Sequence, residues 1–116
     1  MVGILILEDD SNILELIKSN ISSEIGDFQV YSAADPIEAL GVFERNKLNI
    51  KYLICDYLLP IQNGRDFVDI VKEQSPNLKI CMFTGDIAVN KKMIPSANEV
   101  FYKHEGFTQL IDFLNG

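Results

Sequence analysis

The 116-residue sequence has no tryptophan, one histidine and only two cysteines. Cys55 and Cys81 form neither a CxxC pair nor a zinc-ligand spacing, and both fall in apolar runs, so we expect two buried free thiols. No apolar run approaches the about 20 residues that cross a membrane, and acids follow the short N-terminal run where a signal peptide would be cleaved. The sequence therefore predicts no membrane association and a cytoplasmic location.

Positive charge is also scarce. Ten Lys and Arg stand against 17 Asp and Glu, which gives a formal net charge of −7. Because nucleic-acid-binding domains need clustered Lys and Arg side chains to contact phosphates, we expect no nucleic-acid partner through this domain. The remaining composition, 47% hydrophobic and 23% charged, is typical of a folded domain. The length favours one domain over residues 1–116.

Five short apolar runs alternate with amphipathic segments along the chain. The runs predict strands at residues 2–7, 28–31, 52–55, 80–83 and 100–102, and the segments predict helices at about 12–25, 36–45, 65–74 and 107–114. This alternation indicates an α/β fold with a parallel sheet. Pro95 interrupts the helical pattern of residues 87–98, so we expect a short or missing helix there. With few apolar anchors, that segment is also expected to be the most mobile.

Local signals mark where the helices begin. Asn12 and Glu15 fit a capping box for the first helix, and Asp35 followed by Pro36 indicates the start of the second. The dipeptide Asn63-Gly64 is typical of a turn ahead of the third helix.

Polar side chains follow the predicted strands at their carboxyl ends. Glu8 and Asp9 follow the first strand, Asp56 the third, Thr84 the fourth and Lys103 the fifth. In an open α/β sheet these ends face one crevice. A single strand-end Asp is more often structural than functional, but five chemically compatible residues on successive strands favour one site.

These residue types suit phosphoryl chemistry. Carboxylates within reach of one another make an oxygen site of the kind that Mg²⁺ uses. Asp56 could accept a phosphoryl group as an aspartyl phosphate. Lys103 would then neutralise phosphoryl oxygens, and the Thr84 hydroxyl would donate to another. Asp10 is accounted for by the favourable position of an acid at a helix N-terminus.

The chain resembles the response-regulator receiver domain family. The resemblance rests on Ile4–Asp10, on Asp56–Pro60 with Gly64, on Phe83–Gly85 and on Tyr102-Lys103, in the family's order. It implies a single doubly wound domain, with a five-stranded parallel sheet in the order 2-1-3-4-5 and helices on both faces. It also implies that a histidine kinase or histidine phosphotransfer protein phosphorylates Asp56. Phosphorylation would switch binding to a downstream output protein or domain, and the chain would not otherwise act as an enzyme.

The same resemblance implies Mg²⁺ as the cofactor. Asp9, Asp56 and the backbone carbonyl of Leu58 would hold the ion directly, and Glu8 would act through water. Asp10 looks peripheral to the metal.

The chain departs from the family's pattern in three ways. His104 follows the lysine where the family usually has proline, so we expect this peptide to be trans, because a cis bond without proline costs about 2.5–4 kcal/mol. Val100 occupies the position where the family often has a switching Tyr or Phe. The interval from Thr84 to Lys103 is shorter than usual. These departures bear on signalling output more than on phosphorylation.

Other functions remain as alternatives. A pseudo-receiver would keep the fold and dock a partner without phosphorylation; the altered region 85–106 favours it and the intact acid, Thr and Lys set opposes it. A flavodoxin-like nucleotide binder would need a phosphate loop after the first strand, where three acids would repel a phosphate. A haloacid-dehalogenase-type phosphatase would need a second Asp at position 58, where the chain has Leu58.

Two side chains are expected to set the lifetime of a phosphoryl group. Leu58 has no group to orient an attacking water and would shield the phosphorus. Asp86 could hold a water, but we expect it to be poorly fixed on a loop beside Gly85.

Overall fold

Strands and helices alternate along the chain, as the sequence predicts. The computed structural model describes all of residues 1–116. Its elements are β1 (Val2–Leu7), α1 (Ser11–Glu24), β2 (Phe28–Ala33), α2 (Pro36–Asn46), β3 (Ile50–Cys55), α3 (Gly64–Gln74), β4 (Lys79–Thr84), the 3₁₀ turn η1 (Lys91–Met93), β5 (Glu99–Tyr102), the 3₁₀ turn η2 (Lys103–Glu105) and α4 (Thr108–Asn115). None of the helices is long and apolar enough to span a membrane.

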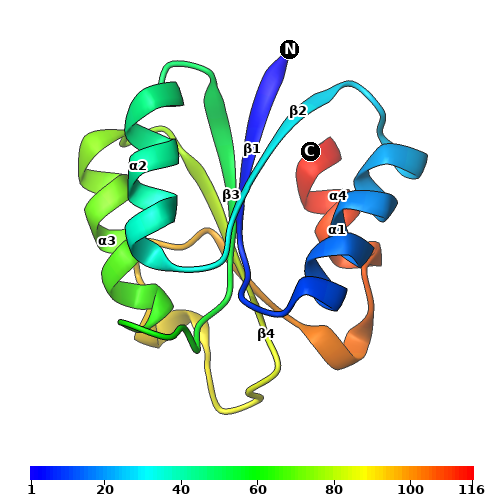
Figure 1. Cartoon of the computed structure of the whole chain (residues 1–116). Helices are drawn as coiled ribbons and strands as arrows, with labels where there is room; N and C mark the ends of the chain where they lie inside the picture. The colour runs from blue at the N-terminus through cyan, green and yellow to red at the C-terminus, as the bar shows by residue number, and fades with distance from the viewer.

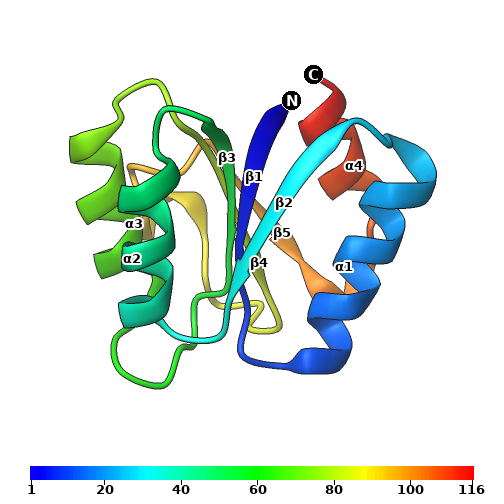
Figure 2. The ribbon, with the colours of Figure 1, turned by 45° about the horizontal axis from the view of Figure 1, so that its top comes forward.

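The five strands form one parallel sheet in the order β2-β1-β3-β4-β5 (Figure 1). This confirms the predicted fold class. Helices α2 and α3 cover one face, and α1 and α4 cover the other (Figure 2). Leu7 at the end of β1 pairs with Ala33 of β2 and Cys55 of β3, so the polar residues that follow these strands meet at one edge of the sheet.

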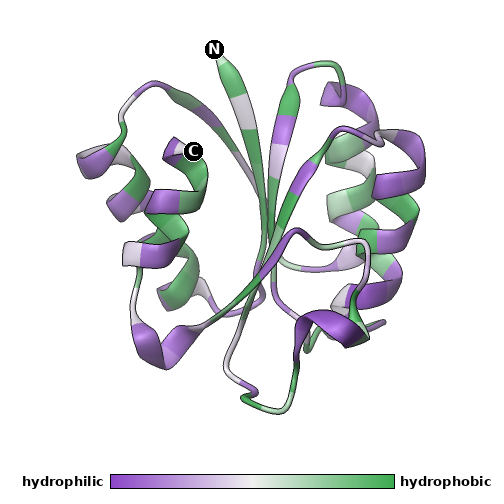
Figure 3. Cartoon of the chain, turned by 180° about the vertical axis from the view of Figure 1, so that it is seen from behind, coloured by the Kyte–Doolittle hydropathy of each residue, from purple (hydrophilic) through white to green (hydrophobic).

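The central strands are buried because helices cover both of their faces. Leu5 and Leu7 belong to the core under α2 and α3, whereas Ile4 and Ile6 belong to the core under α1 and α4. The continuous apolar runs of the sequence therefore correspond to strands without a solvent-facing side. In Figure 3 the helices alternate between hydrophilic and hydrophobic stretches, as expected for elements with one buried side.

Both cysteines are buried and free, as predicted. Cys55 lies in the core on one face of the sheet and Cys81 in the core on the other. Burial is the main cause that raises the pKa of both thiols.

Two of the three predicted helix starts need correction. The predicted capping box of Asn12 and Glu15 is wrong, because the Asp10 carboxylate accepts the N–H of Asn12 at 2.9 Å and so caps α1 itself. Asp35 caps α2 as predicted, accepting the N–H of Glu38 at 2.9 Å. Asn63-Gly64 is not a separate turn.

The dipeptide is instead the start of α3. Asn63 is the N-cap and accepts the N–H of Asp66 at 3.1 Å, and Gly64 is the first helical residue. An Asn that precedes a helix serves as readily for capping as for a turn, because its short amide accepts nearby backbone N–H groups in both settings.

The segment between β4 and β5 contains no α-helix, only η1. This confirms the expectation of a short or missing helix. The expectation of few apolar anchors is wrong, because Val89, Ile94 and Ala97 are buried in the core shared with α2 and α3. The Tyr102 hydroxyl also donates to the Val89 carbonyl at 2.7 Å. Apolar contacts and hydrogen bonds, including two between Asn98 and the backbone of Ile80 in β4, therefore hold this irregular segment against the sheet.

The chain after Lys103 takes a different route from the proline-containing pattern. All peptide bonds are trans, including the one before His104, as predicted. Residues Lys103–Glu105 form η2, and Gly106 follows with a φ of 84°, a left-handed conformation that glycine adopts without strain.

Candidate functional site

The structure brings together the three acids that the sequence placed at one crevice. Carboxylate oxygens of Glu8, Asp9 and Asp56 all lie within 4.8 Å of one another. Glu8 and Asp56 are buried, at 2% and 7% exposure, whereas Asp9 is open to solvent. Glu8 and Asp56 are therefore enclosed by the protein, whereas Asp9 faces the solvent from which a ligand would approach.

Backbone hydrogen bonds beyond the strand ends fix these acids. The Asp56 N–H donates to the Leu7 carbonyl at 3.0 Å, and the Glu8 N–H donates to the Ala33 carbonyl at 3.1 Å. The parallel ladder thus continues by one residue past β1 and β3. Glu8 and Asp56 lie side by side because their strands are neighbours in register.

Lys103 completes the cluster from the end of β5. Its ammonium nitrogen lies 2.7 Å from Glu8 Oε1 and 3.0 Å from Asp56 Oδ2. The contact with Asp56 places Lys103 beside the predicted acceptor. The pairing with Glu8 is a contact that the sequence pattern did not reveal.

The electrostatics of the cluster follow from burial. Burial raises the pKa of Glu8 to about 7, the hydrogen bond from Lys103 opposes this rise, and the Asp56 charge adds to it. Burial lowers the pKa of Lys103, but its bonds to the two carboxylates outweigh that effect and the net shift is upward. Lys103 is therefore an ammonium at neutral pH, one positive charge among three acids.

This donor set fits a magnesium ion. All available ligand atoms are oxygens, the type that Mg²⁺ prefers, and the acids outnumber the single lysine. Ligands about 2.1 Å from one ion lie at most about 4.2 Å apart, so the observed spacing needs only small side-chain adjustments. Asp10 is not part of this cluster; its carboxylate caps α1, as expected for a peripheral residue.

Thr84 is the last residue of β4 and is fully buried. Its Oγ1 accepts the N–H of Asp86 at 3.1 Å, which leaves the hydroxyl proton available for donation. The expectation that Asp86 is poorly fixed is wrong: its carboxylate accepts the N–H of Ala88 at 2.9 Å. This bond closes a turn in which the Asp86 side chain stabilises its own loop. The neighbouring Gly85 favoured the prediction of a flexible loop, so the sequence did not indicate this local bond.

Gly64 determines how closely α3 approaches the acceptor strand. A Cβ at this position would collide with the Asp56 carbonyl oxygen and would come within 2.8 Å of Met82 Cε. The Gly64 N–H also donates to the Tyr57 carbonyl at 2.7 Å. The sequence motif includes Gly64, and this close contact with the backbone of the site explains why a glycine is needed there. Leu58 lies between Asp56 and Gly64 in the chain, and its side chain is 60% exposed.

Known proteins resemble this chain in sequence and in fold. The family model of the response regulator receiver domain matches residues 4–115. An uncharacterized transcriptional regulatory protein of Bacillus subtilis, YcbL, is 31% identical over 85 residues, which are 72% of this chain and 36% of that protein. The chain thus spans about a third of the length of that relative.

Solved structures share the fold. The response regulator TrrA of Thermotoga maritima, in complex with Mg²⁺ and BeF, superposes with a TM-score of 0.88 at 24% identity, over 99% of this chain and 97% of that one. A receiver domain from Clostridium thermocellum gives a TM-score of 0.84 at 25% identity, over 99% and 92% of the two chains. Because the family model spans nearly the whole chain and its acids, Thr and Lys meet at one edge of the sheet, the chain belongs to the response regulator receiver domain family.

Proposed function

We propose that residues 1–116 form one receiver domain that accepts a phosphoryl group on Asp56 in a Mg²⁺-dependent reaction. One observation carries the proposal: the Lys103 ammonium lies 3.0 Å from Asp56 Oδ2, beside carboxylate oxygens of Glu8 and Asp9. Receiver domains belong to two-component systems and are generally not ordinary enzymes. The only chemistry proposed for this chain is transfer of a phosphoryl group to Asp56 and its later hydrolysis.

The reaction makes one bond and breaks another. A carboxylate oxygen of Asp56 attacks phosphorus, and the bond from phosphorus to the donor breaks, its electron pair leaving with the donor. Lys103 neutralises a phosphoryl oxygen, and the Thr84 hydroxyl donates a hydrogen bond to another. Positioning and charge neutralisation are most of what this reaction requires from a protein.

Mg²⁺ would be held directly by Asp9, Asp56 and the Leu58 backbone carbonyl, with Glu8 acting through water. Bound there, it would neutralise charge on the transferred group. Asp9 is exposed and Asp56 is buried, so ions would approach from the Asp9 side.

The proposed partners follow from family membership. A histidine kinase or histidine phosphotransfer protein would supply the phosphoryl group, and a downstream output protein or domain would respond to it. We propose neither a nucleic-acid nor a membrane partner for this domain. The cytoplasmic location stays a prediction from the sequence.

Incubation with acetyl phosphate and Mg²⁺, followed by intact mass, tests the proposal. We expect the wild type to gain one phosphoryl group, and we expect no gain in Asp56→Asn or when EDTA removes the metal. Asp66→Asn, at an exposed acid in the first turn of α3, is the matched control and should be labelled like the wild type. Undiminished labelling of Asp56→Asn would remove Asp56 from the role.

The pseudo-receiver is the second candidate. The observation that favours it is the altered segment after β4, where η1 replaces a helix and the chain turns through η2 after Lys103. A pseudo-receiver would not retain Mg²⁺ binding, followed as a change in tyrosine fluorescence or NMR shifts, and would gain no mass with acetyl phosphate. Mass gain in the wild type would exclude this candidate.

A further inference from the structure

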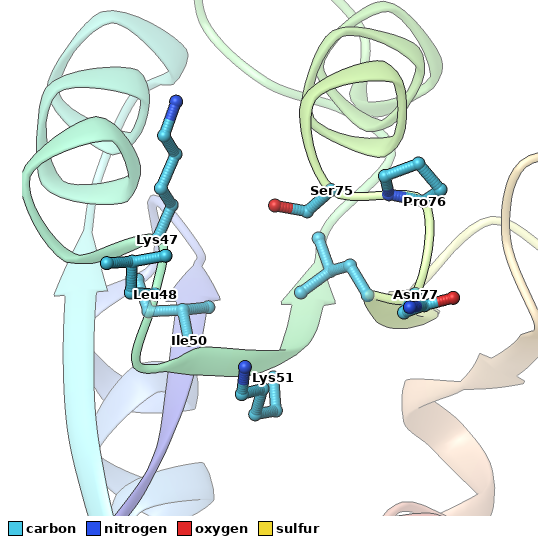
Figure 4. Close-up of a pocket in the computed structure, with 8 residues that line it drawn as sticks. Lys47, Leu48, Ile50, Lys51, Ser75, Pro76 and Asn77 are labelled. Atoms are coloured by element: carbon cyan, nitrogen blue, oxygen red, sulfur yellow. The ribbon is translucent and has the colours of Figure 1, made fainter.

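The edge of the sheet opposite Asp56 has a hollow that phosphoryl transfer does not use. It has a volume of about 210 Å³ and lies between the α2–β3 and α3–β4 connections (Figure 4). Its lining includes Lys47, Leu48 and Lys51 on one side and Ser75, Pro76 and Asn77 on the other. A second hollow, of about 310 Å³, shares Lys47 and Leu48 and adds Arg45. The two hollows thus meet at Lys47 and Leu48.

This surface is positively charged on a chain that is otherwise strongly acidic. Arg45, Lys47 and Lys51 are all exposed, and Glu44 is the one acid that lines either hollow. The whole chain has a net charge of −7. An acidic partner is therefore repelled by most of the molecule and attracted here.

Leu48 adds an apolar contact to this surface. Its side chain is 90% exposed, the highest value among the exposed large hydrophobic residues. A single exposed leucine needs no explanation on its own. Leu48, however, stands where the two hollows meet, flanked by cationic side chains, and so combines apolar and electrostatic contacts in one place.

A purely structural explanation covers only part of the surface. Bases at the end of a helix interact favourably with its C-terminal partial charge, which accounts for Arg45 and Lys47 at the end of α2. Lys51 lies on β3 and has no such helix end, and Leu48 gains nothing from the dipole. The helix end therefore explains neither Lys51 nor Leu48, and both are available to contact a partner.

We propose that this basic surface, defined by Arg45, Lys47, Leu48 and Lys51, binds an acidic peptide segment of a partner protein that carries an aliphatic side chain. Carboxylates of the segment pair with the bases, and its aliphatic side chain packs on Leu48. Because the bases are exposed, the complex is weakened by salt.

Binding at this surface is independent of phosphorylation. Lys51 lies near the start of β3 and Asp56 directly follows its end, so they are roughly 16 Å apart along the strand. That separation exceeds the Debye length of about 8 Å at physiological salt. The surface therefore serves as a constant attachment point, not as the output of the switch, and the inference does not rest on the proposed function.

NMR titration of the ¹⁵N-labelled chain tests the proposal with two synthetic peptides, one alternating Glu with Leu and one of equal charge with Ser in place of Leu. We expect the Glu-Leu peptide to shift amides of residues 45–51 and 75–79. The double variant Lys47→Glu, Lys51→Glu should weaken binding by about tenfold or more. The double variant Lys91→Glu, Lys92→Glu makes the same charge change at exposed residues of η1 and should change binding less than about twofold.

Further variants test the apolar contact, and other ligands test the alternative occupants of the surface. Leu48→Ser should weaken binding of the Glu-Leu peptide but not of the Glu-Ser peptide, and Asp56→Asn should bind both like the wild type. Thermal melts check that each variant is folded. Equal losses in the two double variants, shifts elsewhere, or no shifts would overturn the proposal. Tighter binding of phosphatidylglycerol vesicles or oligothymidylate than of the peptide would assign the surface to a different class of ligand and overturn it too.

Discussion

Lys103 and Glu8 form an ion pair of 2.7 Å at the carboxyl edge of the sheet, with Glu8 only 2% exposed. The same ammonium lies 3.0 Å from Asp56 Oδ2. One lysine therefore balances both the proposed acceptor and a neighbouring acid before any metal or phosphoryl group arrives. The charge balance of the metal-free site depends on this residue.

Replacing Lys103 by Met should destabilise the metal-free protein and tighten its binding of Mg²⁺. Loss of the ammonium leaves two buried carboxylates without their counter-charge, and we expect a cost of about 2 kcal/mol, since protonation of Glu8 limits the penalty. A cation then replaces the lost charge, so added Mg²⁺ should restore much of the stability. Phosphorylation should slow, because phosphoryl oxygens lose their counter-charge. Urea unfolding with and without Mg²⁺ measures the first two effects.

Lys18→Met is the control for this experiment. Lys18 makes only a surface pair with Glu15 at 3.7 Å, and such pairs contribute about 0–1 kcal/mol. Weaker Mg²⁺ binding in Lys103→Met than in the wild type would contradict the charge-balance account.

Asp9 and Asp10 should differ sharply in their effect on metal binding. Asp9 lies in the carboxylate cluster, whereas Asp10 caps α1 through the N–H of Asn12. We expect Asp9→Asn to weaken Mg²⁺ binding about tenfold or more, and Asp10→Asn to change it little, because Asn is also a good N-cap. A metal titration followed by tyrosine fluorescence makes the comparison. Similar losses in the two variants would show that Asp10 also takes part in the metal site.

Gly64→Ala should impair both stability and phosphorylation. The added Cβ collides with the Asp56 carbonyl oxygen, so α3 or the acceptor strand must move, at a cost of about 1–3 kcal/mol. Gly41→Ala in α2 is the matched control: its Cβ meets only the flexible Arg45 side chain, and alanine should stabilise the helix by up to about 1 kcal/mol. Thermal unfolding and acetyl-phosphate labelling of both variants test this. Normal labelling of Gly64→Ala would mean that the site tolerates the displacement.

Leu58→Asn should shorten the lifetime of the phosphoryl group. The amide would orient a water that the leucine side chain excludes, and we expect loss to accelerate by up to about tenfold, or about 1.4 kcal/mol in barrier. Because the Ala88 N–H holds the Asp86 carboxylate in place, Asp86 could also position a water, and Asp86→Ala is measured alongside. Intact mass over time, after removal of the phosphodonor, follows the decay. An unchanged or slower decay in Leu58→Asn would rule out shielding by Leu58.

Tyr102→Phe should loosen the segment between β4 and β5. The hydroxyl donates to the Val89 carbonyl at 2.7 Å, and loss of one such bond costs about 1 kcal/mol. We expect amide exchange in residues 87–94 to accelerate about fivefold, with the rest of the sheet unchanged. Tyr52→Phe, where no hydroxyl bond is made and the ring packs on Phe28 and Phe113, is the control. Exchange that is equally fast in the wild type and in Tyr102→Phe would mean that the other contacts hold the segment without this bond.

The sequence by itself determined the sheet and the edge at which the site lies. Apolar runs such as Ile4–Leu7 predict buried strands because only a strand covered on both faces tolerates four consecutive apolar residues in a parallel sheet. Acids and a lysine directly after such runs must emerge at one edge, because parallel strands share a direction. The start of α2 at Asp35 and Pro36 could be predicted equally well, because capping involves only neighbouring residues.

Only the tertiary structure decided the contacts between residues distant in sequence. The pair of Lys103 with Glu8 depends on how far a long side chain from β5 reaches across the sheet, and the role of Gly64 depends on the approach of α3 to the Asp56 backbone. Val89 and Ile94 lie in a segment whose helical pattern is interrupted by Pro95, so the local pattern did not reveal that they are buried. Local patterns report backbone preferences, whereas these features arise from packing between elements, which the chain settles only when it is folded.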